Sequence, residues 1–220
     1  MKEKLFVILL SLALCPAFAQ KPSWTDNFRK RKIDTDYWSI IPRGLSQWDM
    51  FMSDASELYK FKWGTLQLGV FNSDGLITGG IYTKGKVHFG YGRLEIKAKI
   101  ESAQGVWPAI WMKPVDDIKT PYGGEIDIME HLNHDDFIYQ TIHTGYTYET
   151  KNKDQVNSIK VSIKVKEFNI YAVEHRRDYI AFYVNGVETL RYSRNDGDSE
   201  YKWPFDRDYF LMIDTQAGGE

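Results

Sequence analysis

The sequence predicts an all-β domain, built either as two packed antiparallel sheets or as a barrel. Polar and apolar residues alternate in several short segments of the 220-residue chain, and Gly, Asn and Asp turns separate these segments. No segment carries a convincing apolar stripe at helical spacing. Because no internal repeat or Pro/Gly/Ser-rich linker divides the chain, residues 20–220 are expected to form a single domain.

The first 19 residues have the pattern of a signal peptide. Lys2 and Lys4 precede an apolar run over residues 5–14, and Ala17-Phe18-Ala19 has the small-x-small form of a cleavage site. We therefore expect cleavage after Ala19 and a secreted, periplasmic or cell-surface protein. Lipid attachment at Cys15, the only cysteine of the chain, is the less favoured alternative. No later apolar run is long enough to span a bilayer.

Strands are predicted most directly in the middle of the chain. Charged and apolar side chains alternate over residues 93–100, which predicts a strand with one face in the core, and residues 159–166 repeat the pattern. Residues 179–184 and 187–190 flank Asn185-Gly186. This dipeptide tolerates the positive φ angles of a type I′ turn, so the two segments are expected to form a β-hairpin.

The composition of the chain excludes several classes of protein. The chain has 28 Lys+Arg against 30 Asp+Glu, a formal net charge of −2, and 43% of its residues are hydrophobic. It therefore has no basic surface for nucleic acid, no polybasic stripe for an anionic membrane, and too many apolar residues to be disordered. The aromatic content of 15% suits a β core or a groove that stacks on sugars. We expect a monomer.

The segment with the most evident chemistry is Gly123-Gly124-Glu125-Ile126-Asp127-Ile128-Met129-Glu130. On a regular strand Glu125 and Asp127 share a face, whereas Glu130 points the opposite way. One extra residue, a β-bulge around Ile128 and Met129, would return Glu130 to the face of the other two acids.

Paired carboxylates on a rigid strand suit glycoside hydrolysis with retention of configuration. That reaction needs a nucleophile and an acid/base roughly 5–5.5 Å apart, and like-charge repulsion raises one pKa so that one acid stays protonated. Asp127, which lies between Glu125 and Glu130, would hydrogen-bond the nucleophile. An acid cluster on a solvent-facing strand, or a calcium site, remains an open alternative on spacing alone.

Several segments together resemble glycoside hydrolase family 16. The acid strand is similar to the family's bulged Glu-x-Asp-x-x-Glu signature, and the resemblance extends from about Trp24 to the end of the chain. The other matching segments, in the family's order, are Thr83-Lys84-Gly85-Lys86, Tyr91-Gly92-Arg93-Leu94-Glu95, Gly105-Val106-Trp107-Pro108-Ala109-Ile110-Trp111-Met112, Thr141-Ile142-His143 and Ala217-Gly218-Gly219. The resemblance implies a concanavalin-like jelly-roll β-sandwich of two antiparallel sheets.

The resemblance also implies roles for the acids. Glu125 would be the nucleophile, Glu130 the general acid/base and Asp127 the assisting carboxylate of a double displacement that needs no cofactor. Trp107 and Trp111 resemble aromatic residues of the family's cleft, and His143 resembles a histidine beside the acid/base.

Each of the cleft residues has a structural alternative. Trp107 and Trp111 suit core packing as well as a cleft, and His143 suits a purely structural role. His131 and His134 follow a strand and are interpreted as loop residues, so no metal ligand is assigned.

The C-terminal segment predicts a strand that lines the cleft. Alternation over residues 210–216 places Asp214 and Gln216 on one face, where they would hydrogen-bond sugar hydroxyls, although surface polarity is an alternative. Family members usually continue with a tryptophan and a closing strand, whereas this sequence ends at Glu220. We therefore expect a truncated C-terminal strand. This leaves open whether the chain has the structural calcium position that the resemblance implies on the convex face.

The substrate is less well defined than the reaction. The segments Ile41-Pro42-Arg43-Gly44, Met52-Ser53-Asp54 and 76–83 most resemble members that act on β-galactoside chains of mucin-type glycans. Trp48 and Tyr82 would be groove aromatics, with core packing as the alternative. Arg43, Lys84 and Lys86 are candidates for isolated sulfate groups.

We therefore predict an endo-β-glycosidase that acts on a β-linked polysaccharide or glycoprotein glycan. A laminarinase-like endo-β-1,3(4)-glucanase is the first alternative. A non-catalytic, lectin-like carbohydrate-binding domain is the second, although binding alone has no use for the three acids. A structural cell-surface β-domain would leave the acid strand unexplained.

Overall fold

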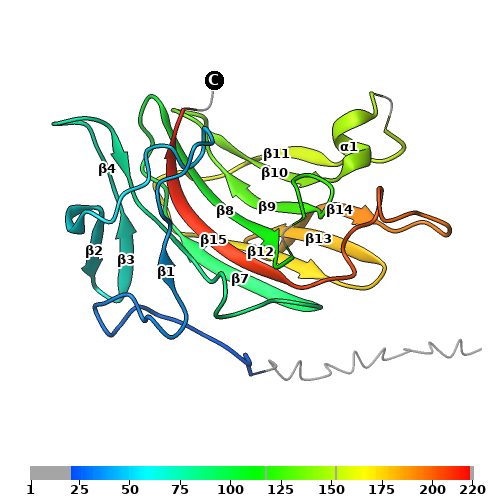
Figure 1. The fold of residues 1–220 in the computed structure, drawn as a ribbon, viewed down its shortest axis with the longest axis horizontal. Helices are drawn as coiled ribbons and strands as arrows, with labels where there is room; N and C mark the ends of the chain where they lie inside the picture. The colour runs from blue at the N-terminus through cyan, green and yellow to red at the C-terminus, as the bar shows by residue number, and fades with distance from the viewer. Residues whose placement is uncertain (1–20, 117, 152, 219–220) are drawn as a thin grey trace, which may run out of the picture.

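The alternating segments form strands in a computed structural model that describes residues 21–116, 118–151 and 153–218 (Figure 1). The predicted signal peptide with Ala19 and Cys15, and the C-terminal Gly219 and Glu220, lie outside the described residues. The strands are β1 (Ser39–Ile40), β2 (Tyr59–Lys62), β3 (Thr65–Leu68), β4 (Val70–Phe71), β5 (Ile77–Thr78), β6 (Gly80–Tyr82), β7 (Gly92–Ala98), β8 (Val106–Pro114), β9 (Glu125–Glu130), β10 (Phe137–His143), β11 (Ser158–Ser162), β12 (Asn169–His175), β13 (Tyr179–Val184), β14 (Val187–Ser193) and β15 (Tyr209–Ala217).

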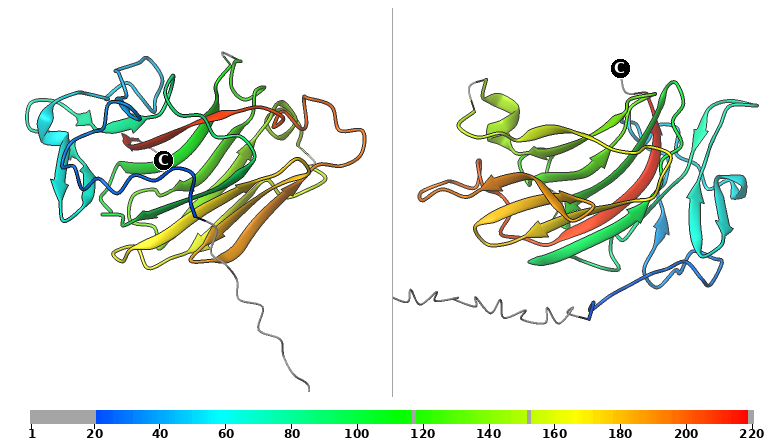
Figure 2. Two further views of the ribbon diagram at one scale, coloured as in Figure 1. Left: turned by 90° about the horizontal axis from the view of Figure 1, so that it is seen from below. Right: turned by 180° about the vertical axis from the view of Figure 1, so that it is seen from behind.

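Two antiparallel sheets pack as layers, which confirms the predicted sandwich (Figure 2). The larger sheet has seven strands in the order β1-β6-β15-β8-β9-β10-β11, and the smaller has four in the order β14-β13-β12-β7. Two small sheets, β2-β3 and β4-β5, lie beside the β1 edge of the larger sheet (Figure 1). We call the face of the seven-stranded sheet that points away from the four-stranded sheet the open face.

The hairpin prediction is confirmed. β13 and β14 pair antiparallel around Asn185 and Gly186, whose φ angles are 52° and 83°. The predicted strand over residues 159–166 ends early, at Ser162, because its partner β10 begins at Phe137, the residue that pairs with Ser162.

A short helix, α1 (Gly145–Glu149), follows β10 directly. The Thr144 side chain accepts a hydrogen bond from the Thr147 backbone N–H, and the Thr144 backbone N–H donates to the Thr147 hydroxyl, which closes a capping box. This cap fixes the end of β10, where His143 lies. Within the described residues, no helix has the length and apolar character that a membrane crossing requires.

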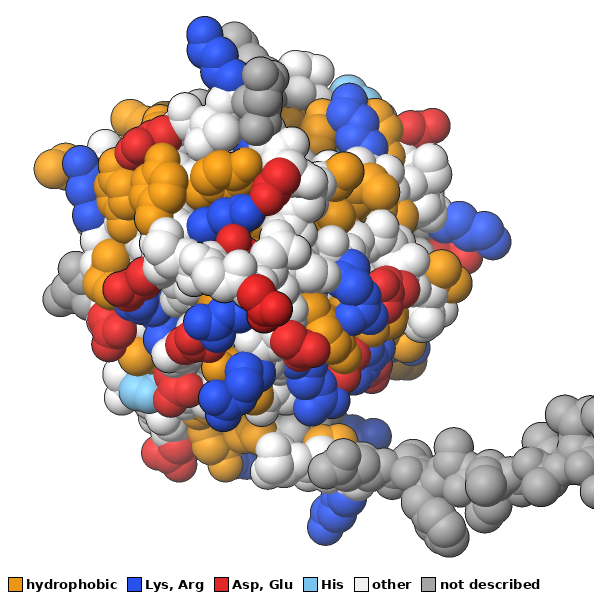
Figure 3. Space-filling model, turned by 90° about the vertical axis from the view of Figure 1, so that its right-hand side faces the viewer, with side chains coloured by type: hydrophobic (Ala, Val, Ile, Leu, Met, Phe, Trp, Pro, Cys, Tyr) orange, Lys and Arg blue, Asp and Glu red, His pale blue; other side chains and the backbone are white. Residues whose placement is uncertain are grey.

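The main core lies between the sheets. Ile110 and Ile126 from the larger sheet and Tyr171 and Phe182 from the smaller sheet are each at most 1% exposed and belong to one cluster. A second apolar cluster, on the open face, includes Trp111 and Met212. On the surface shown in Figure 3, cationic and anionic side chains are interspersed rather than gathered by sign.

Candidate active site

The acid strand β9 contains the bulge that the spacing of its acids predicts. Between Asp127 and Glu130, three residue steps on β9 oppose only two on β10. Ile128 and Met129 are 0% and 2% exposed and both belong to the main core. Glu130 therefore returns to the open face, which it shares with Glu125 and Asp127.

Close packing fixes the beginning of β9. Gly124 has a φ of +79°, and a Cβ at this position would lie 2.6 Å from the Phe205 ring and 2.7 Å from the Tyr209 hydroxyl. That hydroxyl donates to the Gly123 carbonyl at 2.9 Å. Glycine is required here both by the backbone conformation and by the approach of the rings. The consequence is a fixed position for Glu125, the next residue.

Cross-strand partners share a face, so the strand register shows what surrounds the acids. Two rows of cross-strand partners run across the open face from β10 to β6. One row consists of Thr141, Asp127, Trp111, Met212 and Tyr82. The other consists of Tyr139, Glu130, Ala109, Asp214 and Gly80. Glu125 pairs with His143, and Gln216 pairs with Trp107. The register thus brings nine of the ten predicted site residues onto one face, and the tenth, Trp48, packs against Trp111 with ring centroids 5.0 Å apart.

Specific hydrogen bonds hold the acids. Trp107 Nε1 donates to Glu130 Oε1 at 2.9 Å. His143 Nε2 lies 3.0 Å from Asp127 Oδ2, and the His143 side chain is 35% exposed whereas the Asp127 side chain is only 5% exposed. The three acids therefore lie in a partly closed site that His143 borders on its solvent side.

Burial is the largest cause of the raised pKa values of the three acids. Loss of hydration raises the pKa of Glu125 to about 7, with repulsion from Asp127 as the second cause. Burial likewise raises the pKa of Asp127 to about 8, with repulsion from Asp214 second. For Glu130, burial and then Asp127 raise the pKa to about 8, whereas His143 and the Trp107 hydrogen bond lower it. Burial and repulsion between neighbouring carboxylates thus raise the pKa of all three acids above its ordinary value.

Sequence reasoning missed Lys113. This residue lies two positions after Trp111 on β8, and its charge lowers the pKa of both Glu125 and Asp127. Its Nζ also lies 5.8 Å from the Trp111 ring centroid. The only signal in the sequence was its place in the alternation of Trp107 and Trp111, because residues two apart on a strand share a face.

Asp214 and Gln216 do not reach solvent, contrary to the expectation that they line an open cleft. Each is 2% exposed. Asp214 Oδ2 accepts a hydrogen bond from Trp111 Nε1 at 2.8 Å, whereas Gln216 Oε1 is buried without a protein partner among the described residues. Burial raises the pKa of Asp214 to about 7. Trp111 itself is 5% exposed, so it forms the floor of the open face rather than an exposed platform.

A pocket of about 360 Å³ lies on the open face between the acids and the β1 edge. Trp48, Tyr82 and Phe210 contribute its aromatic walls, and Lys113 stands on its side nearest the acids. Tyr82 and Phe210 make an edge-to-face contact with centroids 6.3 Å apart. The predicted groove aromatics Trp48 and Tyr82 thus line a real cavity.

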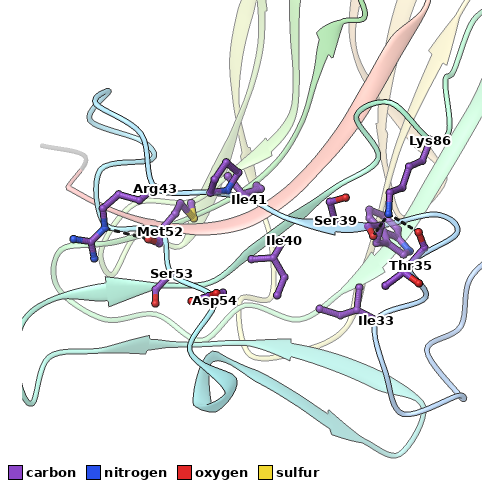
Figure 4. Close-up of a pocket in the computed structure, with 12 residues that line it drawn as sticks. Ile33, Thr35, Ser39, Ile40, Ile41, Arg43, Met52, Ser53, Asp54 and Lys86 are labelled. Atoms are coloured by element: carbon purple, nitrogen blue, oxygen red, sulfur yellow. Dashed lines mark hydrogen bonds between the residues drawn. The ribbon is translucent and has the colours of Figure 1, made fainter.

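A second pocket, of about 730 Å³, lies at the β1 edge (Figure 4). The predicted sulfate candidates Arg43 and Lys86 line this pocket rather than the acid site. Lys86 Nζ donates to the Thr35 and Trp38 carbonyls, and Arg43 Nε donates to the Met52 carbonyl at 3.3 Å (Figure 4). Of the three candidates, only Lys84 lines the pocket beside the acids.

In the described part of the chain, one compact group of side chains has the residue types that bind metal ions, and it consists of two of the acids and the histidine. Ligand atoms of Glu125, Asp127 and His143 all lie within 4.8 Å of one another. A divalent cation would therefore compete with protons for the same groups. His131, which is buried, bonds the Asp135 carbonyl at 2.8 Å in the loop after β9, where the sequence places it.

Two proteins named for their enzymatic activity are similar to this chain in sequence. The keratan-sulfate endo-1,4-beta-galactosidase of Sphingobacterium multivorum is 33% identical over 208 residues, which cover 89% of this chain and 48% of the relative. The beta-glucanase of Rhodothermus marinus is 34% identical over 150 residues, which cover 63% of this chain and 52% of the relative. The chain therefore spans about half the length of these relatives.

The fold and the sequence profile agree with these similarities. A solved structure reported for endo-acting O-glycanases of the human gut microbiota that initiate mucin breakdown superimposes with a TM-score of 0.79 at 29% identity, covering 89% of this chain and 85% of that one. The profile of the glycosyl hydrolases family 16 matches residues 48–219. That match includes the bulged acid strand and the ten predicted catalytic and cleft residues. The chain therefore belongs to glycosyl hydrolases family 16.

Proposed function

We propose that the protein is a retaining endo-β-glycosidase, with β-galactoside chains of mucin-type O-glycans as its substrate. The bulged strand β9 carries this proposal, because it holds Glu125, Asp127 and Glu130 on one open face in a member of a hydrolase family. A lectin has no use for that arrangement. The export predicted from residues 1–19 and the calcium position stay predictions.

The first chemical step uses Glu125 and Glu130 together. The Glu125 carboxylate attacks the anomeric carbon while Glu130 donates its proton to the departing glycosidic oxygen, which leaves a glycosyl ester on Glu125. Glu130 then takes a proton from water, the water oxygen attacks the anomeric carbon, and the ester bond to Glu125 breaks. The raised pKa of Glu130, about 8, suits a group that must hold a proton to donate.

Asp127 and His143 support the two reacting acids. Asp127 is held between Glu125 and Glu130, and its repulsion raises the pKa of each. His143 is within hydrogen-bond distance of Asp127, which orients that carboxyl toward the reacting acids. These groups supply the nucleophile, the acid and the base, so no cofactor is assigned to the reaction.

The choice of a galactoside substrate rests on two similarities. The galactosidase from Sphingobacterium multivorum covers more of this chain than the beta-glucanase does, 89% against 63%. The O-glycanase structure matches 89% of the chain at 29% identity. An endo-β-glucanase is the second candidate, because the Rhodothermus marinus relative reaches 34% identity over the region it matches.

Product analysis tests this proposal. The protein and its Glu125→Gln variant are incubated with laminarin, mixed-linkage glucan, agarose, keratan-type chains and mucin O-glycans, and new oligosaccharides are separated by mass. We expect short products from mucin or keratan-type chains with the unsubstituted protein alone. Products from laminarin instead would select the glucanase. Binding without products would select the lectin-like alternative.

A leaving-group comparison tests the acid role of Glu130. Glu130→Gln should lose far more rate on natural glycans than on aryl glycosides, because a good leaving group needs little proton assistance. Equal losses on both substrate types would remove Glu130 from that role.

A further inference from the structure

The pocket between the acids and the β1 edge contains more charge than a neutral sugar needs. Three lysines line it, and each comes from a different part of the chain: Lys84 from the segment after β6, Lys113 from β8, and Lys119 from the segment before β9. Lys84 Nζ lies 5.7 Å from the Phe210 ring centroid. The sequence separates these lysines widely, so only the fold brings them together.

The carboxylates of this pocket have other partners. Asp116 forms an ion pair with Arg207 at 3.3 Å. Asp49 Oδ1 accepts a hydrogen bond from the Ser46 backbone N–H at 2.8 Å. By contrast, neither Lys113 nor Lys119 forms an ion pair within the described ranges of the chain. The ammonium groups of Lys113 and Lys119 therefore lie beside the aromatic walls of the pocket without an ion-pair partner among the described residues.

The pocket lies where a substrate would pass. From β9 the open face continues over β8, β15 and β6 to the edge strand β1. Lys113 forms the boundary, since it lines the pocket and its charge also lowers the pKa of Glu125. A sugar next to the reacting one would rest against Tyr82 and Phe210, with its substituents directed at the lysines.

We propose that this pocket is a subsite for a glycan unit that carries an acidic substituent, a sulfate ester or a carboxylate, bound by Lys113 and Lys119. The proposal rests on the proposed glycosidase function and makes its substrate an acidic glycan. A charge-assisted hydrogen bond to each ammonium group would favour the acidic unit over a neutral one. Lys86 cannot substitute for these residues, because it bonds two backbone carbonyls in the other pocket.

Matched substrates test the subsite. Keratan-type chains are compared with the same chains after chemical desulfation, and with sialylated chains that carry a carboxylate. We expect kcat/KM to be about tenfold higher on one acidic form than on the neutral form. A higher value on the sulfated chains identifies the sulfate ester, and a higher value on the sialylated chains identifies the carboxylate. Equal values on all three would overturn the proposal.

Substitutions show whether the lysines are responsible. In Lys119→Met and Lys113→Met the acidic-to-neutral ratio of kcat/KM should fall toward one. The ratio is informative even for Lys113, because a change in the acids affects both substrates alike. Lys97→Met, on β7 of the other sheet, is the matched control and should keep the full ratio. Retention of the ratio in both pocket variants would contradict the assignment.

A binding experiment separates this proposal from the glycosidase function. Calorimetric titration of Glu125→Gln with sulfated, sialylated and neutral oligosaccharides measures affinity without turnover. If the unsubstituted protein cuts nothing but the acidic oligosaccharide still binds about tenfold more tightly, the subsite stands and the glycosidase proposal fails. Higher salt should reduce this preference, because ions screen exposed charges. Equal affinity for acidic and neutral oligosaccharides refutes the subsite.

Discussion

The hydrogen bond between Trp107 and Glu130 shows how one side chain changes the pKa of the proposed acid. The indole N–H donates to the Glu130 carboxyl, which favours its ionised form and lowers the pKa of Glu130. Burial and repulsion act in the opposite direction and prevail, since that pKa is about 8. Trp107 therefore limits how far the proton affinity of Glu130 rises.

The Trp107→Phe variant tests this balance. Removal of the N–H donor should raise the pKa of Glu130 further, so that Glu130 keeps its proton to higher pH. The alkaline limb of the kcat/KM profile should then move upward by roughly one pH unit. Profiles are measured on a natural glycan, with Trp63→Phe, at an 88% exposed position, as the control. An alkaline limb that stays in place or moves to lower pH would contradict the role of this hydrogen bond.

At the scale of elements, the strands with one buried face are the ones that the sequence predicts. Alternation over residues 93–100 predicts β7 (Gly92–Ala98), because alternation records which side chains are buried. The bulge was also predictable, since five positions separate Glu125 from Glu130 and a regular strand cannot place them on one face. Helix α1 was not predicted, because its five residues are too few to show an apolar stripe.

A comparison of Gly124 with Gly186 distinguishes the effect of backbone conformation on stability from the effect of packing. Gly124 and Gly186 have similar φ angles, +79° and +83°. A Cβ at Gly186 meets nothing within 4 Å, whereas one at Gly124 would collide with Phe205 and Tyr209. Alanine at either position costs roughly 1 kcal/mol for the left-handed conformation. Only at Gly124 does overpacking add about 1–3 kcal/mol more.

We therefore expect Gly186→Ala to lower Tm by a few degrees and to leave kcat unchanged. Gly124→Ala should lower Tm more and should also reduce kcat, because the displaced Tyr209 and the shifted backbone move Glu125. Thermal unfolding and kcat/KM of the two variants are compared side by side. Equal losses of Tm would show that packing at the beginning of β9 has no effect beyond backbone strain.

At the scale of the whole molecule, the topology brings together acids that are distant in the sequence. β15, near the end of the chain, lies between β6 and β8, so Asp214 is separated from Glu130 only by Ala109. Strand order depends on contacts across the whole chain, and no local pattern records it. Sequence reasoning therefore found Asp214 but not its burial among the acids, and it missed Lys113 entirely.

This arrangement has a cost in stability that depends on pH. Burial raises the pKa of Asp214 to about 7, from 3.8 in an unfolded chain. Between these two values the folded protein holds a proton that the unfolded chain has lost, so the free energy of unfolding decreases as the pH rises through this range. The raised pKa values of Glu125, Asp127 and Glu130 act in the same direction.

Asp214→Asn should therefore stabilise the protein in alkaline solution. The asparagine amide still has an oxygen that can accept the hydrogen bond from Trp111 Nε1. Unlike the carboxyl group, the amide cannot ionise beside Asp127 and Glu130. We expect a gain of ~1 kcal/mol or more near pH 8.5, seen as a Tm increase of roughly 2–4 °C per kcal/mol, and a smaller gain near pH 5, which is closer to the pKa of the unfolded chain. Thermal unfolding at both pH values measures it. Asp196→Asn, at an exposed loop position, is the control and should show no such dependence. A Tm change of equal size at both pH values would mean that the pKa of Asp214 is not raised in the folded protein.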